Sequence, residues 1–245
     1  MICMILAAGY ATRLYPLTEN FPKPLLKVRD KTILDWLLDD IEASGRVRKY
    51  VVISNHKFAP HFEEWAKTKP YPVEVIDDGT TSNETRLGAV RDVQFAIDKL
   101  GIDEDILLIA GDNVLDFSLR TLLDYAAEKD ASCVMRYAEP QQEKLKKCGV
   151  LTLGDEDRIL SMVEKPAEPP SRWCCPPFYY YKAADLMIGQ AIDEGCGYDA
   201  PGSYVAWLCQ KRPVYAMEMP GRRYDIGNLA SYEQVQADYQ GIVKG

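Results

Sequence analysis

The chain has 245 residues, of which 47% are hydrophobic and 27% charged, so it can bury a sizeable core and is not a disordered tail. Its 29 basic and 37 acidic residues give a formal charge of -8, which argues against a nucleic acid or an anionic membrane as the main partner. Any phosphate-binding site must therefore be a local concentration of positive charge within one large domain, residues 1–245.

Short apolar runs alternate with helical patterns along the chain, which is typical of an α/β protein with a mostly parallel sheet. The apolar runs are four to eight residues long, and they predict strands at residues 1–7, 50–54, 73–76, 106–110 and 131–137. Amphipathic helices lie between them. Apolar side chains share one helical face over residues 34–41, after the polar residues Asp30 and Thr32, and again over residues 119–126.

The pattern changes from about Gly149 onward. Two strands are expected, at residues 150–153 and 159–164, and a stretch rich in proline and aromatic residues follows at 166–181. We interpret this stretch as part of an insertion folded over the sheet. A last helix is expected over residues 230–243.

The seven cysteines are odd in number, scattered and never spaced C-x-x-C, which disfavours a disulfide framework and a structural zinc site. Such thiols suit a reducing cytosol, so we expect a cytoplasmic protein. The apolar opening, residues 1–8, is too short to span a bilayer and runs into a polar loop. It is better interpreted as a buried strand, and no membrane partner is expected.

The first predicted strand ends in the loop Leu6-Ala7-Ala8-Gly9-Tyr10-Ala11-Thr12-Arg13-Leu14. This loop is not G-x-G-x-x-G, and the dipeptide Gly-Lys occurs nowhere, which disfavours a Rossmann cofactor site and a P-loop. What remains is a loop of small residues followed by two cations, Arg13 and Lys23. An ordinary loop with a solvated arginine explains Arg13 alone, but it does not explain the pair.

Residues 6–18 and the segment Pro22-Lys23-Pro24 resemble the signature L-A-x-G-x-G-T-R-L-x-P-x-T followed by P-K-P. This is the signature of the NDP-sugar pyrophosphorylases, the nucleotidyltransferases that join a nucleoside triphosphate to a sugar 1-phosphate. The resemblance covers nearly the whole chain. It implies a Rossmann-like, mostly parallel mixed sheet with helices on both faces, of the GT-A-like type, with an acceptor-binding subdomain at about residues 149–225. Ala11 replaces the second glycine of the signature, and a positive φ would be strained there.

The resemblance also implies roles for the loop. The residues that it assigns to the nucleotide are Leu6, Ala8, Gly9, Thr12 and Arg13. Arg13 would act on the triphosphate together with Lys23, which reaches the phosphates from the far side of the loop. Physical chemistry agrees with this assignment, because fixed cations and backbone N–H groups stabilise the charge that builds up as pyrophosphate leaves.

A second motif, Gly111-Asp112-Asn113, follows the strand predicted at 106–110, and it resembles the metal motif of the family. Asp112 would bind Mg²⁺ and assist catalysis, although a turn aspartate or a helix cap would explain it equally well on its own. Asp225 lies in a segment that resembles the family motif D-I-G, and it would be the second metal ligand. Two aspartates brought together from such distant positions would be costly unless a cation lay between them.

The third motif, Val163-Glu164-Lys165-Pro166, resembles the acceptor motif V-E-K-P. Lys165 would neutralise the phosphate of the sugar 1-phosphate, and Glu164 would accept hydrogen bonds from its hydroxyl groups. In the family, small residues near Gly88 lie against the base and ribose. Tyr180, in the aromatic stretch 173–181, could stack on a sugar, cage a quaternary ammonium or pack in a strand core.

These motifs together predict a Mg²⁺-dependent enzyme with small-molecule substrates, a nucleoside triphosphate and a sugar 1-phosphate. Glucose 1-phosphate with dTTP or UTP is the default pair, and we expect a monomer or a homo-oligomer. The main alternative is a CTP-dependent cytidylyltransferase acting on phosphocholine. Two other functions are further alternatives. A metal-dependent glycosyltransferase would need the motif D-x-D at residues 111–113, where this chain has Gly-Asp-Asn. A regulatory sugar-nucleotide sensor would have kept the fold but would no longer catalyse the reaction.

Overall fold

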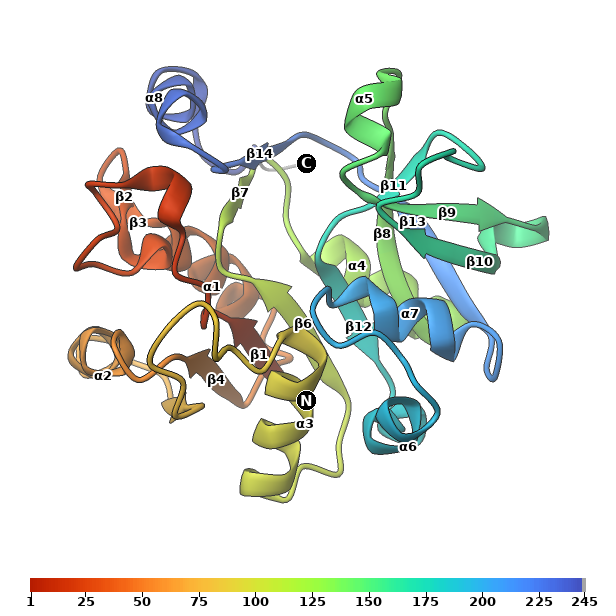
Figure 1. Cartoon of the computed structure of the whole chain (residues 1–245), viewed down its shortest axis with the longest axis horizontal. Helices are drawn as coiled ribbons and strands as arrows, with labels where there is room; N and C mark the ends of the chain where they lie inside the picture. The colour runs from red at the N-terminus through yellow and green to blue at the C-terminus, as the bar shows by residue number, and fades with distance from the viewer. Residues whose placement is uncertain (244–245) are drawn as a thin grey trace. The chain divides into compact units, whose positions relative to one another are not determined.

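The computed structural model describes residues 1–243, and the chain divides into two compact units (Figure 1). The first unit comprises Met1–Arg86, Ile109–Arg120 and the residues from Pro220 onward. The second comprises Leu87–Leu108 and Thr121–Met219. The second unit therefore contains most of the subdomain expected at 149–225 but begins earlier in the chain, whereas residues 220–225 belong to the first unit.

The first unit contains a parallel sheet of apolar strands. Its strands are β1 (Ile2–Leu6), β4 (Lys49–Ser54), β5 (Val73–Asp77) and the end of β6 (Ile106–Ala110), in the order β6-β1-β4-β5. β4 pairs in parallel with both β1 and β5. These strands are the four predicted in this part of the sequence, and most of their side chains are buried, as continuous apolar runs indicate.

Short elements surround this sheet within the first unit. They are η1 (Thr12–Leu14), η2 (Lys23–Leu25), β2 (Lys27–Val28), β3 (Lys31–Thr32), α1 (Ile33–Ala43), α2 (Ala59–Ala66), β7 (Asn113–Leu115), β14 (Arg223–Asp225) and α8 (Leu229–Asp238). Thr32 caps α1: its hydroxyl accepts a hydrogen bond from the backbone N–H of Asp35 at 3.0 Å, and the Asp35 carboxylate accepts one from the backbone N–H of Thr32.

The second unit is built around β8 (Ser132–Ala138). β8 pairs antiparallel with β11 (Trp173–Cys175) and β12 (Phe178–Tyr181), and in parallel with β13 (Val214–Glu218). The hairpin β9 (Gly149–Leu153) and β10 (Ile159–Glu164) extends this sheet, because β9 also pairs with β11. The remaining elements are α3 (Ala89–Leu100), α4 (Arg120–Lys129), α5 (Gln142–Leu145), η3 (Asp155–Asp157), η4 (Ala183–Asp185), α6 (Ile188–Asp193) and α7 (Gly202–Leu208).

The α/β class with a mixed sheet is confirmed, but two expectations about local structure were wrong. The stretch 166–181 supplies two strands of the second unit's sheet instead of folding over it, because Cys174 pairs with residues of both β8 and β9. The last helix ends at Asp238, not at residue 243. It ends there because Tyr239 is buried in an extended conformation and its hydroxyl donates to the carbonyl of Leu115 at 2.8 Å.

Two further observations concern the described residues as a whole. All seven cysteines are free thiols, and five of them are buried. A search of the helices within residues 1–243 finds none with the length and hydropathy that crossing a bilayer requires.

Candidate active site

The loop after β1 is held by its carbonyl groups and leaves its N–H groups open. The carbonyl of Ala8 accepts a hydrogen bond from the Asn55 amide at 2.9 Å, and that of Ala11 accepts one from the Thr18 hydroxyl at 2.8 Å. Within residues 1–243, none of the backbone N–H groups from Ala8 to Arg13 donates to an acceptor. A run of unpaired N–H groups on a tight loop is a favourable environment for a phosphate group.

The conformation of this loop depends on one residue with a left-handed backbone. Ala11 has φ 47° and ψ 41°, which confirms that the position favours glycine. Gly9 is exposed, and a Cβ there would meet no atom within 4 Å, so the space beside it is open. Thr12 and Arg13 are exposed too, and the Arg13 guanidinium forms no ion pair with any residue of the described chain. This guanidinium is therefore available to an anionic ligand.

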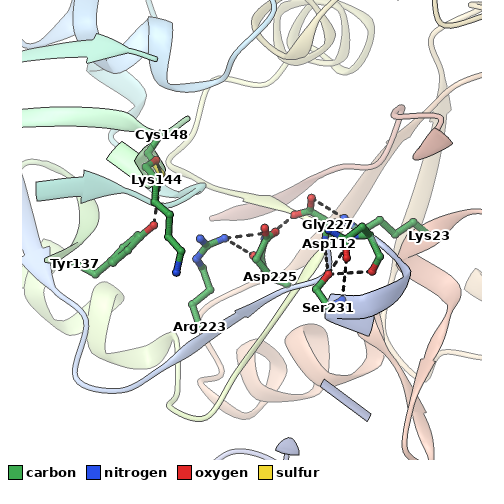
Figure 2. Close-up of polar contacts among 11 residues, drawn as sticks. Lys23, Asp112, Tyr137, Lys144, Cys148, Arg223, Asp225, Gly227 and Ser231 are labelled. Atoms are coloured by element: carbon green, nitrogen blue, oxygen red, sulfur yellow. Dashed lines mark hydrogen bonds and ion pairs between the residues drawn. The ribbon is translucent and has the colours of Figure 1, made fainter. Parts of the chain in front are cut away.

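Lys23 is brought to Asp112 by close packing at the end of β6. The Leu6 carbonyl accepts a hydrogen bond from the backbone N–H of Gly111 at 3.1 Å. A Cβ at Gly111 would lie 3.1 Å from Pro24, so the glycine lets η2 approach the strand. The Lys23 side chain is only 10% exposed, and its Nζ lies 3.0 Å from Asp112 Oδ2 (Figure 2). The predicted far-side lysine thus contacts the predicted metal ligand.

The pairing of β7 with β14 brings the backbones at the two predicted metal ligands close together. Asp225 lies opposite Asn113 in the antiparallel register, and the backbone N–H of Ile226 donates to the carbonyl of Asp112 at 3.3 Å. Asp112 directly precedes β7 and Asp225 is the last residue of β14, so the backbones at the two aspartates lie close together, and we call these residues the acidic pair. Their side chains are 40% and 53% exposed, which leaves both accessible to a ligand.

Two residues for which the sequence predicted no role complete this cluster. Asn113 is fully buried; its amide nitrogen donates to Asp112 Oδ1 at 2.5 Å, and its amide oxygen accepts from Arg223 at 2.6 Å. Arg223 Nη1 also lies 3.6 Å from Asp225 Oδ1 (Figure 2). The sequence could have indicated the position of Arg223, because residues 223 and 225 lie two apart and must share a face if they belong to one strand.

The acidic pair suits a hydrated Mg²⁺ ion but not a cage made by the protein alone. Within the described residues, no group of three or more His, Cys, Asp or Glu side chains is placed to hold a metal ion. Mg²⁺ is commonly bound by one or two carboxylates, with substrate phosphates and water as its other ligands. Two accessible carboxylates beside a phosphate-receptive loop fit that description.

The predicted acceptor residues lie in the second unit. Lys165 has a left-handed backbone with φ 46°, and its N–H donates to the Cys148 carbonyl at 2.9 Å. Its side chain is exposed and has no ion-pair partner among residues 1–243. Glu164, at the end of β10, packs so closely against Gly149 and Gly202 that a Cβ on Gly202 would collide with its carboxylate.

Glu164 is half-buried without a compensating hydrogen bond. No donor in the described part of the chain reaches its carboxylate. Burial therefore raises the pKa of Glu164 above its ordinary value, and the nearby positive charge of Lys165 lowers that pKa only in part. A half-buried acceptor of this kind is suited to hydroxyl groups of a ligand, which would supply the missing donors.

Gly88 and Tyr180, also in the second unit, have structural roles. Gly88 has φ 90°, and a Cβ there would lie 2.6 Å from the carbonyl oxygen of Tyr198, so packing alone requires glycine. Tyr180 is only 8% exposed, and its hydroxyl donates to Asp105 at 2.5 Å. Of the three interpretations of Tyr180, strand core is the one that this geometry fits, and its expected role in acceptor binding finds no support.

The left-handed conformation of Ala11 gives a prediction about stability. Ala11→Gly should raise the free energy of unfolding by about 1 kcal/mol, because glycine removes a backbone strain larger than the entropy that it adds to the unfolded chain. Urea denaturation at pH 7 measures the difference. Ala8→Gly is the matched control: residue 8 has no positive φ, so the same change in the same loop should destabilise. Equal effects of the two changes would contradict the assigned strain.

The burial of Glu164 gives a prediction about pH. Because its pKa is raised, the folded protein holds a proton that the unfolded chain releases, and stability falls as pH rises through the window between the two pKa values. Glu164→Gln should therefore raise the melting temperature at pH 7, with a gain that shrinks as the pH falls toward about 4.5. Thermal melts across this range test it. Glu168→Gln removes an exposed charge from the same segment and should show no such trend.

Comparison with known proteins identifies the family of this chain. The family description "Nucleotidyl transferase" matches residues 2–241. UTP--glucose-1-phosphate uridylyltransferase AglF of Haloferax volcanii is 27% identical over 232 residues, which are 93% of this chain and 91% of that protein. The bifunctional protein GlmU of Methanocaldococcus jannaschii is 31% identical over 255 residues, which cover 100% of this chain but only 57% of GlmU.

A solved structure supports the same conclusion for the fold. A UDP-glucose pyrophosphorylase complexed with UDP-glucose has a TM-score of 0.84 and 18% sequence identity, with 97% of each chain covered. At this identity the likeness concerns the fold alone. The family match extends over nearly the whole length, and it includes the loop after β1, the acidic pair and Lys165. The chain therefore belongs to the nucleotidyl transferase family.

Proposed function

We propose that this nucleotidyl transferase uses UTP or dTTP as its donor and a sugar 1-phosphate as its acceptor, with Mg²⁺ as cofactor. A phosphate oxygen of the acceptor forms a bond to the α-phosphorus of the donor. The bond from that phosphorus to the bridging oxygen breaks, and pyrophosphate leaves with the electron pair. The observation that carries the proposal is the cluster in the first unit, where the open loop, Lys23 and the acidic pair come together.

In this mechanism the residues of the chain align the donor and neutralise charge. The N–H groups from Ala8 to Arg13 bind the phosphates, and the Arg13 side chain faces the charge that grows on pyrophosphate. No general base is needed, because the acceptor phosphate is already ionised at neutral pH. Mg²⁺ bound at the acidic pair would supply further positive charge at the phosphates.

On the acceptor side, Lys165 and Glu164 offer the two kinds of contact that a sugar 1-phosphate needs. The free ammonium group of Lys165 suits the phosphate, and the unpaired carboxylate of Glu164 suits the sugar hydroxyls. Phosphocholine fits less well, because Tyr179, Tyr180 and Tyr181 are buried in β12 and present no aromatic cage. The relatives described above are also not named as cytidylyltransferases.

A substrate screen tests the proposal directly. The protein is incubated with Mg²⁺, one of five nucleoside triphosphates and one acceptor, and pyrophosphate release is measured. The acceptors are a panel of sugar 1-phosphates and, separately, phosphocholine. We expect release with UTP or dTTP and a hexose 1-phosphate. Release only with CTP and phosphocholine would overturn the choice of substrates, and no release with any pair would overturn the proposed activity.

The acidic pair gives a quantitative prediction for the same assay. Asp112→Asn or Asp225→Asn should lower kcat by about a hundredfold or more, a loss of roughly 2.7 kcal/mol of transition-state stabilisation, because one ligand charge is removed. Asp30→Asn, which changes an exposed aspartate of the same unit, is the control and should leave kcat near that of the parent protein. Parent-like rates in both site variants, with unchanged circular dichroism, would rule out the two-carboxylate site.

Arg13 and Lys165 should differ in the kinetic constant that they control. Arg13→Ala should mainly lower kcat, because the charge that it faces develops only as pyrophosphate leaves. Lys165→Ala should mainly raise the KM for the sugar 1-phosphate, because the phosphate charge that Lys165 faces is already present in the bound acceptor. Initial rates over a grid of donor and acceptor concentrations separate the two effects. The opposite pattern would show that the donor and acceptor roles of these residues are exchanged.

A further inference from the structure

Both carboxylates of the acidic pair face a cation that belongs to the chain itself. Lys23 Nζ lies 3.0 Å from Asp112 Oδ2, and Arg223 Nη1 lies 3.6 Å from Asp225 Oδ1. The two positive and two negative charges therefore cancel within the first unit before any ligand binds. A divalent cation that arrived alone would have to bind beside two fixed positive charges, which weakens its attraction to the carboxylates.

Arg223 is held in place more firmly than a surface arginine. Its side chain is 17% exposed, and it donates a hydrogen bond of 2.6 Å to the amide oxygen of buried Asn113. The nitrogen of the Asn113 amide donates to Asp112, so this one side chain contacts both Asp112 and Arg223. Because Arg223 and Asp225 are two residues apart in β14, the strand directs both side chains to one face. The arginine cannot easily swing away to make room for a metal ion.

We propose that Arg223 is an internal counter-ion that lowers the affinity of the acidic pair for a free divalent cation. The metal would then bind tightly only together with the triphosphate, whose negative charge outweighs the positive charge of Arg223 and Lys23. The inference rests on the function proposed above, since it assumes that the acidic pair holds the metal. Arg223 is a positioning residue in this scheme, and Asn113 fixes its guanidinium.

Coulomb's law sets the size of the expected effect. One positive charge a few ångströms from a divalent ion, partly screened by water at this accessible site, changes its affinity by about tenfold. Arg223→Gln should therefore tighten the binding of free Mn²⁺ by about tenfold. Arg223→Lys keeps the charge and should bind free Mn²⁺ much as the parent protein does.

Mn²⁺ is the probe, because its free aqueous form is measured by electron paramagnetic resonance. The full chain and its variants are titrated with Mn²⁺ without nucleotide, and Mn²⁺-dependent binding of UTP is measured separately by calorimetry. Arg222→Gln is the matched control: it removes one positive charge next to Arg223, but Arg222 is exposed and lies over the ring of Tyr224. The affinity of the Arg222→Gln variant for Mn²⁺ should differ from that of the parent protein by less than about twofold.

Two additions keep the test decisive. Thermal melts check folding, and Arg223→Met is a second charge-free variant in case Arg223→Gln does not fold. In the double variant with Asp225→Asn, the tightened Mn²⁺ binding should disappear, which locates it at the acidic pair.

The outcomes separate this inference from the function on which it rests. If both charge-free variants bind free Mn²⁺ no more tightly than the parent protein, while Mn²⁺ still supports UTP binding, the counter-ion role is wrong and the proposed function stands. If Mn²⁺ does not support UTP binding even in the parent protein, the proposed metal site fails and the inference fails with it.

Discussion

The site of the first unit depends on the pairing of two strands of three residues each, β7 and β14. Their register decides which side chains share a face, and a slip of one residue would turn Arg223 and Asp225 away from Asn113. β7 follows directly after β6, so Asp112 is anchored to the buried sheet, while β14 brings in the second carboxylate. Each ion pair is weak by itself at an accessible position. The register places both ion pairs around the single side chain of Asn113.

The two units provide carboxylates of opposite character. In the first unit, Asp112 and Asp225 are accessible and each faces a cation, so water and the cation both stabilise the ionised carboxylates. In the second unit, Glu164 is partly buried and its carboxylate lacks a donor within residues 1–243, which costs stability at neutral pH. An arrangement that costs stability without a structural gain is typical of a binding residue. Left-handed Ala11 and Lys165 carry a similar cost in the backbone.

Much of this architecture could be predicted because its signals are local. Buried parallel strands are continuous apolar runs, and the loop and the two aspartates lie in motifs of fixed spacing. The two wrong expectations, the placement of residues 166–181 and the end of the last helix, concern structure that long-range contacts decide. Aromatic β11 and β12 gave no local sign of pairing with β8, and the end of α8 is decided by burial of Tyr239 against Leu115. The roles of Asn113 and Arg223 follow from a register between distant segments, which composition and periodicity do not encode.

The division of the first unit among three stretches of chain affects how the protein is made. The loop after β1 and Lys23 leave the ribosome early, and Asp112 follows, but β14 is translated only after the whole second unit. Until then, the nascent chain has the phosphate-receptive loop and one carboxylate but neither Arg223 nor Asp225. The proposed metal site would therefore form last, once β14 pairs with β7.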